Sequence, residues 1–488
     1  MNIYQKVKAG AEINLAAPAF ISPQGYLTHG QFLALIGWAA KQLHARGVRK
    51  GSIVGISLPH SALHAAVLVA VAQLGAVSVS LQHFFPPLEI AGRIKRFKVQ
   101  YLIRNTDLKE VPDVINIELG KIDIKKNDPL FDPTKLGLEN ATSDDSARFL
   151  LTSGSTGEPQ AVLHTHASWI ERAIRTVDAI DSSSRVILPD MYGTLGNVFL
   201  LGTLFAGGAV VLARMDNYQT LISDINCFAV THLIFPPYIF MAMMPFLPKD
   251  GVAFPTVKHL RPVGSGLSTP FIQDLITRFS PHVCFPYGIS EVGAISLATA
   301  EMLQRYPETS GKIKDWSKAQ VVDENDQVLP FGRSGQIRVA VAGMPNEYYG
   351  EPELSKLKFR DGWFYSSDHG YINEEGYLFI EGRLDDLINF DGSKINPIRI
   401  ESYVVNNTPI KECAIFAIKV NGKNRLCGAF VASKETVAKS LEDHPSIRDV
   451  LKGCYFSINA LPRNDNGKVR RKDLASVFAN EIAQFSKA

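Results

Sequence analysis

The residues best suited to chemistry form a glycine- and hydroxyl-rich loop after an apolar run, Thr152-Ser153-Gly154-Ser155-Thr156-Gly157. Glycines let the backbone approach a ligand closely, while successive N–H groups and hydroxyls can donate to anionic oxygens. Such a loop can wrap a polyphosphate. It is not the GxxxxGK[ST] phosphate loop, because no lysine follows Gly157. Taken alone, the loop is equally compatible with a solvated surface turn.

Four further motifs follow this loop along the chain: Tyr287-Gly288-Ile289-Ser290-Glu291, Trp363-Phe364-Tyr365-Ser366-Ser367-Asp368, Gly382-Arg383-Leu384-Asp385-Asp386-Leu387-Ile388 and Leu461-Pro462-Arg463-Asn464-Asp465-Asn466-Gly467-Lys468. In residue type, order and spacing they resemble the YGxTE, YxTGD, GRxDxxI and PxxxxGK signatures of the adenylate-forming superfamily. That superfamily includes acyl-CoA synthetases, aryl-acid ligases and adenylation domains. The resemblance extends over nearly the whole chain, and an ordered set of motifs is far less likely to arise by accident than one loop.

The resemblance implies a two-step reaction. A carboxylate first attacks the α-phosphate of ATP and expels pyrophosphate, and a thiol then attacks the acyl-adenylate and expels AMP. Both steps require charge neutralisation and alignment of the reactants. The implied cofactors are ATP, Mg²⁺ and CoA, with the phosphopantetheine of an acidic acyl carrier protein as the alternative acceptor. The predicted activity is that of an acyl- or aryl-CoA ligase.

Each motif residue takes the role that its counterpart has in the superfamily. Glu291 is the expected Mg²⁺ ligand, since magnesium is usually held by one or two carboxylates together with phosphates. Ser290 would donate to the α-phosphate. The predicted nucleotide contacts are Thr152, Ser153, Gly154, Ser155, Thr156, Gly157, Tyr287, Gly288, Asp368 and Arg383.

The C-terminal motifs supply the predicted mobile residues. Lys468 would bridge the carboxylate and the α-phosphate, although a lysine in this basic tail could also be simply exposed. Asp385 is the expected hinge. Gly392 and Lys394 resemble the loop that enters for the thiol step.

Three positions depart from the superfamily pattern. Gln160 stands where lysine is usual, Ser367 where glycine is usual, and Lys394 where arginine is usual. These departures keep open a non-catalytic adenylate-binding protein. The chain keeps the acidic and basic residues of the superfamily pattern at Glu291, Asp368, Arg383 and Lys468. Their retention favours an enzyme.

The acid is the least determined part of the prediction. Amino-acid-activating relatives usually carry an aspartate at the position of Tyr192, and its absence argues against an α-amino acid. Asp190, two residues earlier, could hold an amine or face solvent. The predicted pocket residues are Tyr192, Gly193, Gly264, Gly266 and Gly293, and the four glycines, which have no side chains, leave room for a ring or a medium chain.

The elements that must position these residues follow an α/β pattern. Residues 53–58, 62–74 and 77–81 read as strand, helix and strand, which excludes a membrane span at residues 62–81. This alternation of strands and helices continues as far as a predicted helix at residues 270–279. Antiparallel strands are predicted from residue 314 onward. We therefore predict an α/β fold: a large N-terminal domain of doubly wound parallel sheets with a β-barrel-like subdomain, residues 1–382, and a small α+β domain on a hinge, residues 383–488.

Composition agrees with a globular enzyme of more than one domain. The chain has 488 residues, 46% hydrophobic and 20% charged, with a net charge of +3 that requires neither nucleic acid nor a membrane as partner. Residues 383–488 carry 17 Lys and Arg against 12 Asp and Glu, whereas the rest carries 34 against 36. The start has no signal-peptide h-region, and the five cysteines form no CxxC motif, so we expect a cytoplasmic protein without a cysteine-bound metal.

Overall fold

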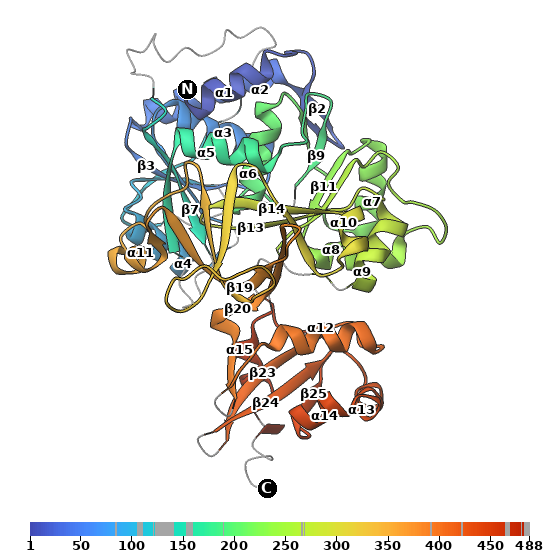
Figure 1. The fold of residues 1–488 in the computed structure, drawn as a ribbon. Helices are drawn as coiled ribbons and strands as arrows, with labels where there is room; N and C mark the ends of the chain where they lie inside the picture. Colours follow the sequence, from blue (N-terminus) through green and yellow to red (C-terminus); the bar gives the residue numbers. More distant parts are fainter. Residues whose placement is uncertain are drawn as a thin grey trace.

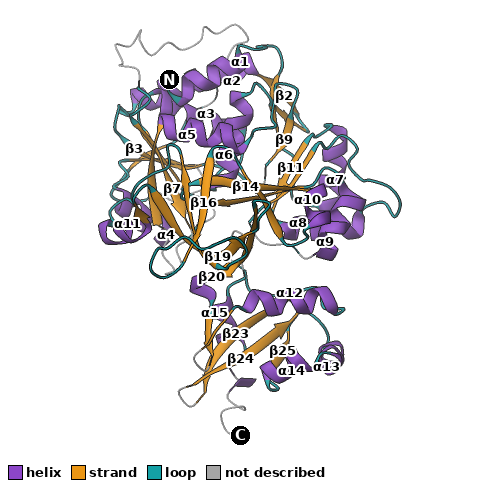
Figure 2. Cartoon of the chain, in the orientation of Figure 1, coloured by secondary structure: helices purple, strands orange, loops and turns teal. Residues whose placement is uncertain are grey.

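The computed structural model describes residues 1–82, 85–104, 111–120, 122, 141–152, 160–188, 190–264, 267, 269–390, 393–420, 423–463, 469–479 and 481–482. Figure 1 shows two bodies, with the residues after β20 (Tyr377–Arg383) forming the smaller one. In Figure 2 each body combines strands with helices on their faces. Among the described helices, none is both long and apolar enough to cross a bilayer.

Two six-stranded sheets carry the α/β alternation. Each is parallel except for one antiparallel pair at its edge, β7–β8 in the first and β1–β2 in the second. The first sheet has the order β6-β5-β3-β4-β7-β8 and consists of β3 (Ile53–Ser57), β4 (Val77–Ser80), β5 (Tyr101–Arg104), β6 (Ile115–Ile117), β7 (Ser146–Thr152) and β8 (Gln160–Thr165). The second has the order β12-β11-β9-β10-β1-β2 and consists of β1 (Pro18–Ser22), β2 (Gly25–Thr28), β9 (Arg185–Ile187), β10 (Ala209–Val211), β11 (His232–Phe235) and β12 (His259–Pro262).

Apolar helices join the two parallel sheets in one hydrophobic core. The core helices are α1 (Ile3–Ala11), α2 (His29–Ala45), α3 (Ala62–Gln73), α5 (His166–Thr176) and α6 (Thr194–Phe205). Helix α3 is buried around its whole circumference from His64 onward, because layers cover it on every side. The helices outside this group are α4 (Pro87–Phe97), α7 (Tyr218–Cys227), α8 (Pro237–Met243), α9 (Thr269–Asp274), α10 (Ala300–Arg305) and α11 (Pro352–Lys358). The helix predicted at residues 270–279 changes to a π-helical turn at Leu275–Phe279.

The third sheet has eight strands, and all of its pairings are antiparallel. It forms an open path among the described residues, so the barrel-like subdomain is an open sheet. Its strands are β13 (Cys284–Ile289), β14 (Gly293–Thr299), β15 (Thr309–Ile313), β16 (Ser317–Val322), β17 (Gly335–Val341), β18 (Phe359–Arg360), β19 (Trp363–Ile372) and β20.

The smaller body has hydrophobic clusters of its own. A two-stranded β21–β22 hairpin precedes the three-stranded sheet β23-β24-β25. Its elements are β21 (Ile388–Phe390), β22 (Ser393–Ile395), α12 (Pro397–Asn407), β23 (Cys413–Val420), β24 (Lys423–Phe430), α13 (Lys434–Asp443), α14 (Pro445–Leu451), β25 (Tyr455–Ser457) and α15 (Arg471–Val477). Cys427 and Cys454 form a disulfide inside this body, which no cysteine motif in the sequence indicated.

Candidate active site

Two hydrogen-bonded pairs of a phenol and a carboxylate lie at the antiparallel sheet. The hydroxyl of Tyr287, on β13, donates to Oδ2 of Asp368, on β19, over 2.6 Å. The hydroxyl of Tyr348 donates to Oε1 of Glu291 over 2.7 Å. Burial, reinforced by the adjacent carboxylate, raises the pKa of each tyrosine above its ordinary value. Both phenols therefore stay protonated and act as donors at neutral pH.

Arg383 links the two pairs. Its charge acts on both phenols and opposes the rise of each pKa. Asp368 and Arg383 are directly opposite one another across β19 and β20, so their Cα atoms lie within about 5.5 Å. The structure thus brings Tyr287, Glu291, Asp368 and Arg383 into one neighbourhood, although they come from three separate motifs.

Local hydrogen bonds hold Asp368 in place. Its backbone N–H donates to Oγ of Ser366 over 3.0 Å, and that hydroxyl donates to the carbonyl of Ile337 over 2.7 Å. Ser367, which replaces the usual glycine, accepts a hydrogen bond from Nζ of Lys358 over 3.1 Å. The departure at this position therefore adds a side-chain contact to the strand before Asp368.

A bend at the end of β13 presents the next motif residues. The β13–β14 pairing shifts register after Tyr287, and a Cβ on Gly288 would lie 2.7 Å from the carbonyl oxygen of Gly293. Only glycine permits this close approach. Ser290 and Glu291 follow in the turn, with Ser290 exposed. No cluster of three or more His, Cys, Asp or Glu side chains placed for a metal occurs in the part of the chain that the structure describes.

The ends of the predicted phosphate loop are paired with one another. Thr152, at the end of β7, is the register partner of Gln160, at the start of β8. The residues between them, which include Ser153, Gly154, Ser155, Thr156 and Gly157, lie outside the described residues. Oε1 of Gln160 is buried and has no partner among the described residues, so the amide is placed inward at the base of the loop.

The predicted mobile residues are described only in part. Lys468 and Gly392 lie outside the described residues. Arg463 and Val469, which stand on either side of residues 464–468 in the chain, form an antiparallel bridge. The backbones of Asp385, in the short helix η4 (Leu384–Asp386), and Lys394, in β22, are described.

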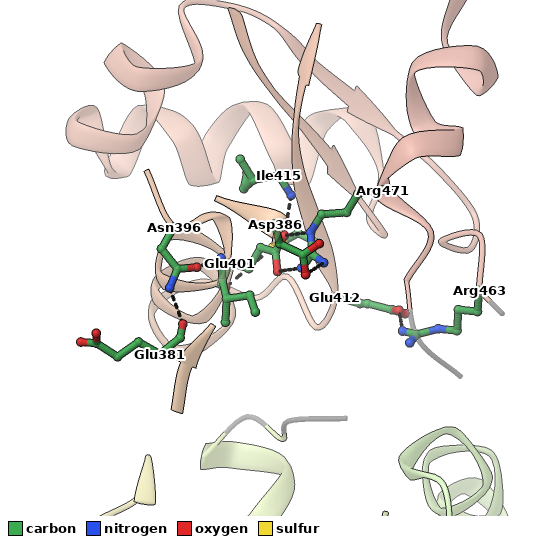
Figure 3. A network of polar contacts seen from close by, with 10 residues as sticks. Glu381, Asp386, Asn396, Glu401, Glu412, Ile415, Arg463 and Arg471 are labelled. Carbon is green, nitrogen blue, oxygen red and sulfur yellow. Dashed lines mark hydrogen bonds and ion pairs between the residues drawn. The ribbon is translucent and has the colours of Figure 1, made fainter. Parts of the chain in front are cut away.

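A network of ion pairs joins η4 to the segment after Lys468 (Figure 3). Arg471 donates twice to Glu401, over 2.6 and 3.1 Å, and its Nη1 lies 3.9 Å from Oδ2 of Asp386. Glu401 also accepts from the backbone N–H of Ile415 over 2.7 Å. Burial opposes protonation of Arg471, but Glu401 and Asp386 outweigh it and hold the pKa of Arg471 above its ordinary value. A second ion pair joins Arg463 to Glu412.

The residues predicted to line the acid pocket lie in different structural environments. Tyr192 is buried, and its hydroxyl donates to the carbonyl of Leu58 over 2.6 Å. Gly193 is the N-cap of α6. Oδ1 of Asp190 accepts from the N–H groups of Tyr192 and Gly193 over 2.7 and 2.6 Å. The Asp190 carboxylate thus holds the turn before α6, a local role that neither sequence alternative included.

The remaining predicted residues also differ in setting. Gly264 is exposed with φ +103°, Gly293 is buried with φ +102°, and Gly266 lies outside the described residues. His166, the first residue of α5, was not among the predicted residues; it is buried, and its Nδ1 accepts from the N–H of Ile3 over 3.3 Å. Burial lowers the pKa of His166 to about 4, which fits a neutral structural histidine.

Sequence reasoning did not find Tyr348, Ser366, Arg148 and Arg172. None of them stands out in the sequence, because Tyr348 lies 57 residues from the carboxylate that it binds. Ser366 lies within a motif that the sequence analysis identified, but no role was assigned to it there. The two arginines are buried beside β8 and α5, where a sequence pattern favours apolar residues.

The chain belongs to the AMP-binding enzyme family, whose model matches residues 8–349. A curated relative, 4-coumarate–CoA ligase-like 6 of Arabidopsis thaliana, is 26% identical over 501 residues and aligns with 91% of this chain and 84% of its own. The family confirms the predicted class, an AMP-forming acid–thiol ligase.

Two solved structures share the fold. ATP-bound MatB of Rhodopseudomonas palustris superposes with a TM-score of 0.83 at 21% identity, covering 99% of this chain and all of that chain (100%). The o-succinylbenzoate CoA synthetase of Bacillus subtilis, solved with its acyl-adenylate, superposes with a TM-score of 0.82 at 20% identity, covering 97% and 98%. The α/β fold predicted from the sequence is thereby confirmed.

Proposed function

We propose that this protein activates a carboxylic acid with ATP and transfers the acyl group to the thiol of CoA. The observation that carries the proposal is the convergence of Tyr287, Asp368, Glu291 and Arg383, from three motifs, on one part of the antiparallel sheet. The relative named 4-coumarate–CoA ligase-like 6 supports CoA as the acceptor.

The residues of the candidate site can assist the bond changes of the first step. A carboxylate oxygen of the acid bonds to the α-phosphorus, and the bond to the β-phosphate oxygen breaks as pyrophosphate leaves. Ser290 donates to the α-phosphate from its exposed turn. Asp368 can accept from ribose hydroxyls, since a carboxylate has about four acceptor sites and Tyr287 occupies only one of them. Lys468 stabilises the charge that develops between carboxylate and phosphate.

Magnesium fits the donor set at Glu291. One carboxylate oxygen accepts from Tyr348, which leaves the other available, and a single protein carboxylate combined with phosphate oxygens is ordinary for Mg²⁺. When bound, the ion would neutralise phosphate charge during the displacement.

In the second step the thiolate sulfur bonds to the acyl carbon and AMP leaves with the electron pair of the broken bond. The smaller body, which follows β20, would turn about Asp385 to bring Gly392 and Lys394 to the site in place of Lys468. Its excess of basic residues suits an anionic acceptor, which includes both CoA and an acidic carrier protein.

The test is release of pyrophosphate with a panel of carboxylic acids, followed by mass identification of the trapped acyl-adenylate. We expect acid-dependent release and turnover with sub-millimolar CoA. Transfer only to a phosphopantetheinylated carrier would replace CoA as the acceptor. Adenylate binding with no pyrophosphate release from any acid would instead identify a non-catalytic binding protein.

A further inference from the structure

Two buried arginines flank one tryptophan in the interior of the larger body. Arg148, on β7, and Arg172, on α5, lie with their Cζ atoms 5.0 and 5.7 Å from the ring centroid of Trp169. His164, the register partner of Arg148 on β8, meets the same ring edge-on at 5.0 Å. Arg148 is 3% exposed and Arg172 8% exposed. We call these three basic residues the arginine cluster.

Among the residues that the structure describes, no acidic side chain is bonded to the arginine cluster. Nη2 of Arg148 donates to Oγ of Ser80 over 2.9 Å, and Nη1 of Arg172 donates to the backbone carbonyl of Glu291 over 3.3 Å. Among the described residues, Nε of both arginines, Nη1 of Arg148 and Nε2 of His164 have no partner, and neither arginine forms an ion pair. Buried charges in proteins are ordinarily paired or bound to a ligand.

Both guanidinium groups nevertheless stay charged. Burial lowers the pKa of Arg148 to about 9 and that of Arg172 to about 10, the latter against the attraction of Glu291. His164 stays neutral, because burial and the two arginine charges hold its pKa well below the ordinary value. Two positive charges therefore remain in the interior at neutral pH, and no carboxylate in the described part of the chain contacts them.

A small cavity opens beside Arg172. It measures about 10 Å³, and its lining includes His164, Ser168, Arg172 and Gly293. A space of this size admits roughly one water-sized group, such as an oxygen at the end of a ligand. Gly293 leaves the space open, because a Cβ there would lie 3.6 Å from Cγ of Arg172.

The other arginine that lines the cavity is already engaged. The guanidinium of Arg175 donates to Glu171 over 2.9 Å and to the carbonyl of Ala342 over 2.5 Å. Arg172 uses Nη1 for the carbonyl of Glu291, but its Nε has no partner among the described residues. Arg172 is thus the cation at this cavity with a donor left for an anion.

We propose that Arg172, supported by Arg148 and His164, binds a second anionic group of the acid substrate, so that the enzyme activates a short dicarboxylic acid. The inference rests on the proposed function, in which the reacting carboxylate lies at Ser290 and Glu291. Arg172 contacts the backbone of Glu291 itself, and the three-residue span from Ser290 to Gly293 is at most about 11 Å. In this proposal the second carboxylate reaches the guanidinium beside the Glu291 backbone that Arg172 contacts.

Chemistry at such a subsite is selective. A guanidinium fork binds a carboxylate through two charge-assisted hydrogen bonds, and exclusion of water strengthens them. A monocarboxylate would leave buried donors without a partner, and sites of this kind reject an analogue lacking the group by large factors. We expect the dicarboxylate to be preferred at least about 100-fold.

The experiment compares kcat/KM for pyrophosphate release with matched acids, succinate against butyrate and malonate against propionate. Arg172→Met should abolish most of the preference for the dicarboxylate. Arg175→Met is the matched control, because it removes a guanidinium from the same helix that is already paired, and it should keep the preference. An equal preference in wild type and Arg172→Met, with pyrophosphate release intact, would overturn the subsite and leave the proposed function standing.

A second measurement does not depend on turnover. Succinate without ATP should raise the Tm of the wild-type protein and leave that of Arg172→Met unchanged, whereas chloride at equal ionic strength should have a smaller effect. An equal shift with chloride would mean an inorganic anion site and overturn the assignment to substrate. Succinate binding at Arg172 without pyrophosphate release from any acid would support the subsite and contradict the proposed function.

Discussion

Arg471 in the smaller body and the two arginines beside Trp169 in the larger body are held in opposite ways. Arg471 donates two hydrogen bonds to Glu401, whose carboxylate also accepts from the N–H of Ile415. Arg148 and Arg172 flank Trp169 with no carboxylate of the described residues in contact. A buried charge that has its counter-charge within the chain contributes to the fold, whereas one without it costs stability until a ligand binds. An arginine paired within the chain therefore positions other segments, whereas an arginine without a counter-charge is available to bind a ligand.

The largest expected effect comes from breaking the paired arginine. Arg471→Met leaves the half-buried Glu401 carboxylate without its counter-charge, which should cost up to about 3–5 kcal/mol in the smaller body. Hydrogen exchange of the β23 and β24 amides measures this loss. The double variant Arg471→Met, Glu401→Leu should recover most of it, because no charge is then left alone. Unchanged protection in Arg471→Met would show that the pair contributes little to the fold.

Next in size is the effect of Lys468, three residues before Arg471. Lys468→Ala should leave the ion-pair network and the stability intact but slow adenylate formation about 100- to 1,000-fold, because charge stabilisation at the α-phosphate is lost. Thioester formation from supplied acyl-adenylate should decline far less. Pyrophosphate release and thioester yield measure the two steps separately. An equal loss in both would contradict the two-conformation mechanism and leave Lys468 without a step of its own.

A pH titration should affect the larger body more than the smaller. Burial lowers the pKa of His166 to about 4 in the folded state, against about 6.5 when unfolded. As the pH falls, the unfolded chain takes up the proton first, so stability is full above pH 6.5 and is lost down to about pH 4. At pH 5 the loss from His166 is about 2 kcal/mol.

Tryptophan fluorescence during urea unfolding measures this effect, because all four tryptophans, Trp38, Trp169, Trp316 and Trp363, lie in the larger body. His166→Gln is the control variant, and it should remove about 2 kcal/mol of the pH dependence. The same pH dependence in wild type and variant would mean that His166 does not remain neutral in the folded protein.

Gln160 should give the smallest effect. Gln160→Lys returns a cation to the base of the phosphate loop, in the larger body, where Oε1 of the glutamine has no partner among the described residues. The KM for ATP should fall about five- to tenfold with little change in kcat, since the added interaction is shared by ground and transition states. Steady-state kinetics at saturating acid measures it. A KM that stays the same or rises would mean that another cation already serves the pyrophosphate.

Prediction from sequence succeeded where structure depends on neighbours in the chain. Hydrophobic patterns located α3 and β4 to within one residue at each end, and they indicated antiparallel strands after residue 314. The pattern failed at residues 275–279, where a π-helical turn replaces the end of the expected helix. It also missed the disulfide between Cys427 and Cys454, which are 27 residues apart and meet only because β24 and β25 pair.

The amino-acid sequence by itself determined the family and the class of chemistry, since the order of its motifs is a property of the chain alone. The tertiary structure decided which side chains complete those motifs. Tyr348 reaches Glu291, Arg471 reaches Glu401, and Arg172 meets a backbone carbonyl, because packing and strand register bring distant segments together. A charge is structural or available to a ligand according to what surrounds it, and those surroundings exist only once the chain has folded.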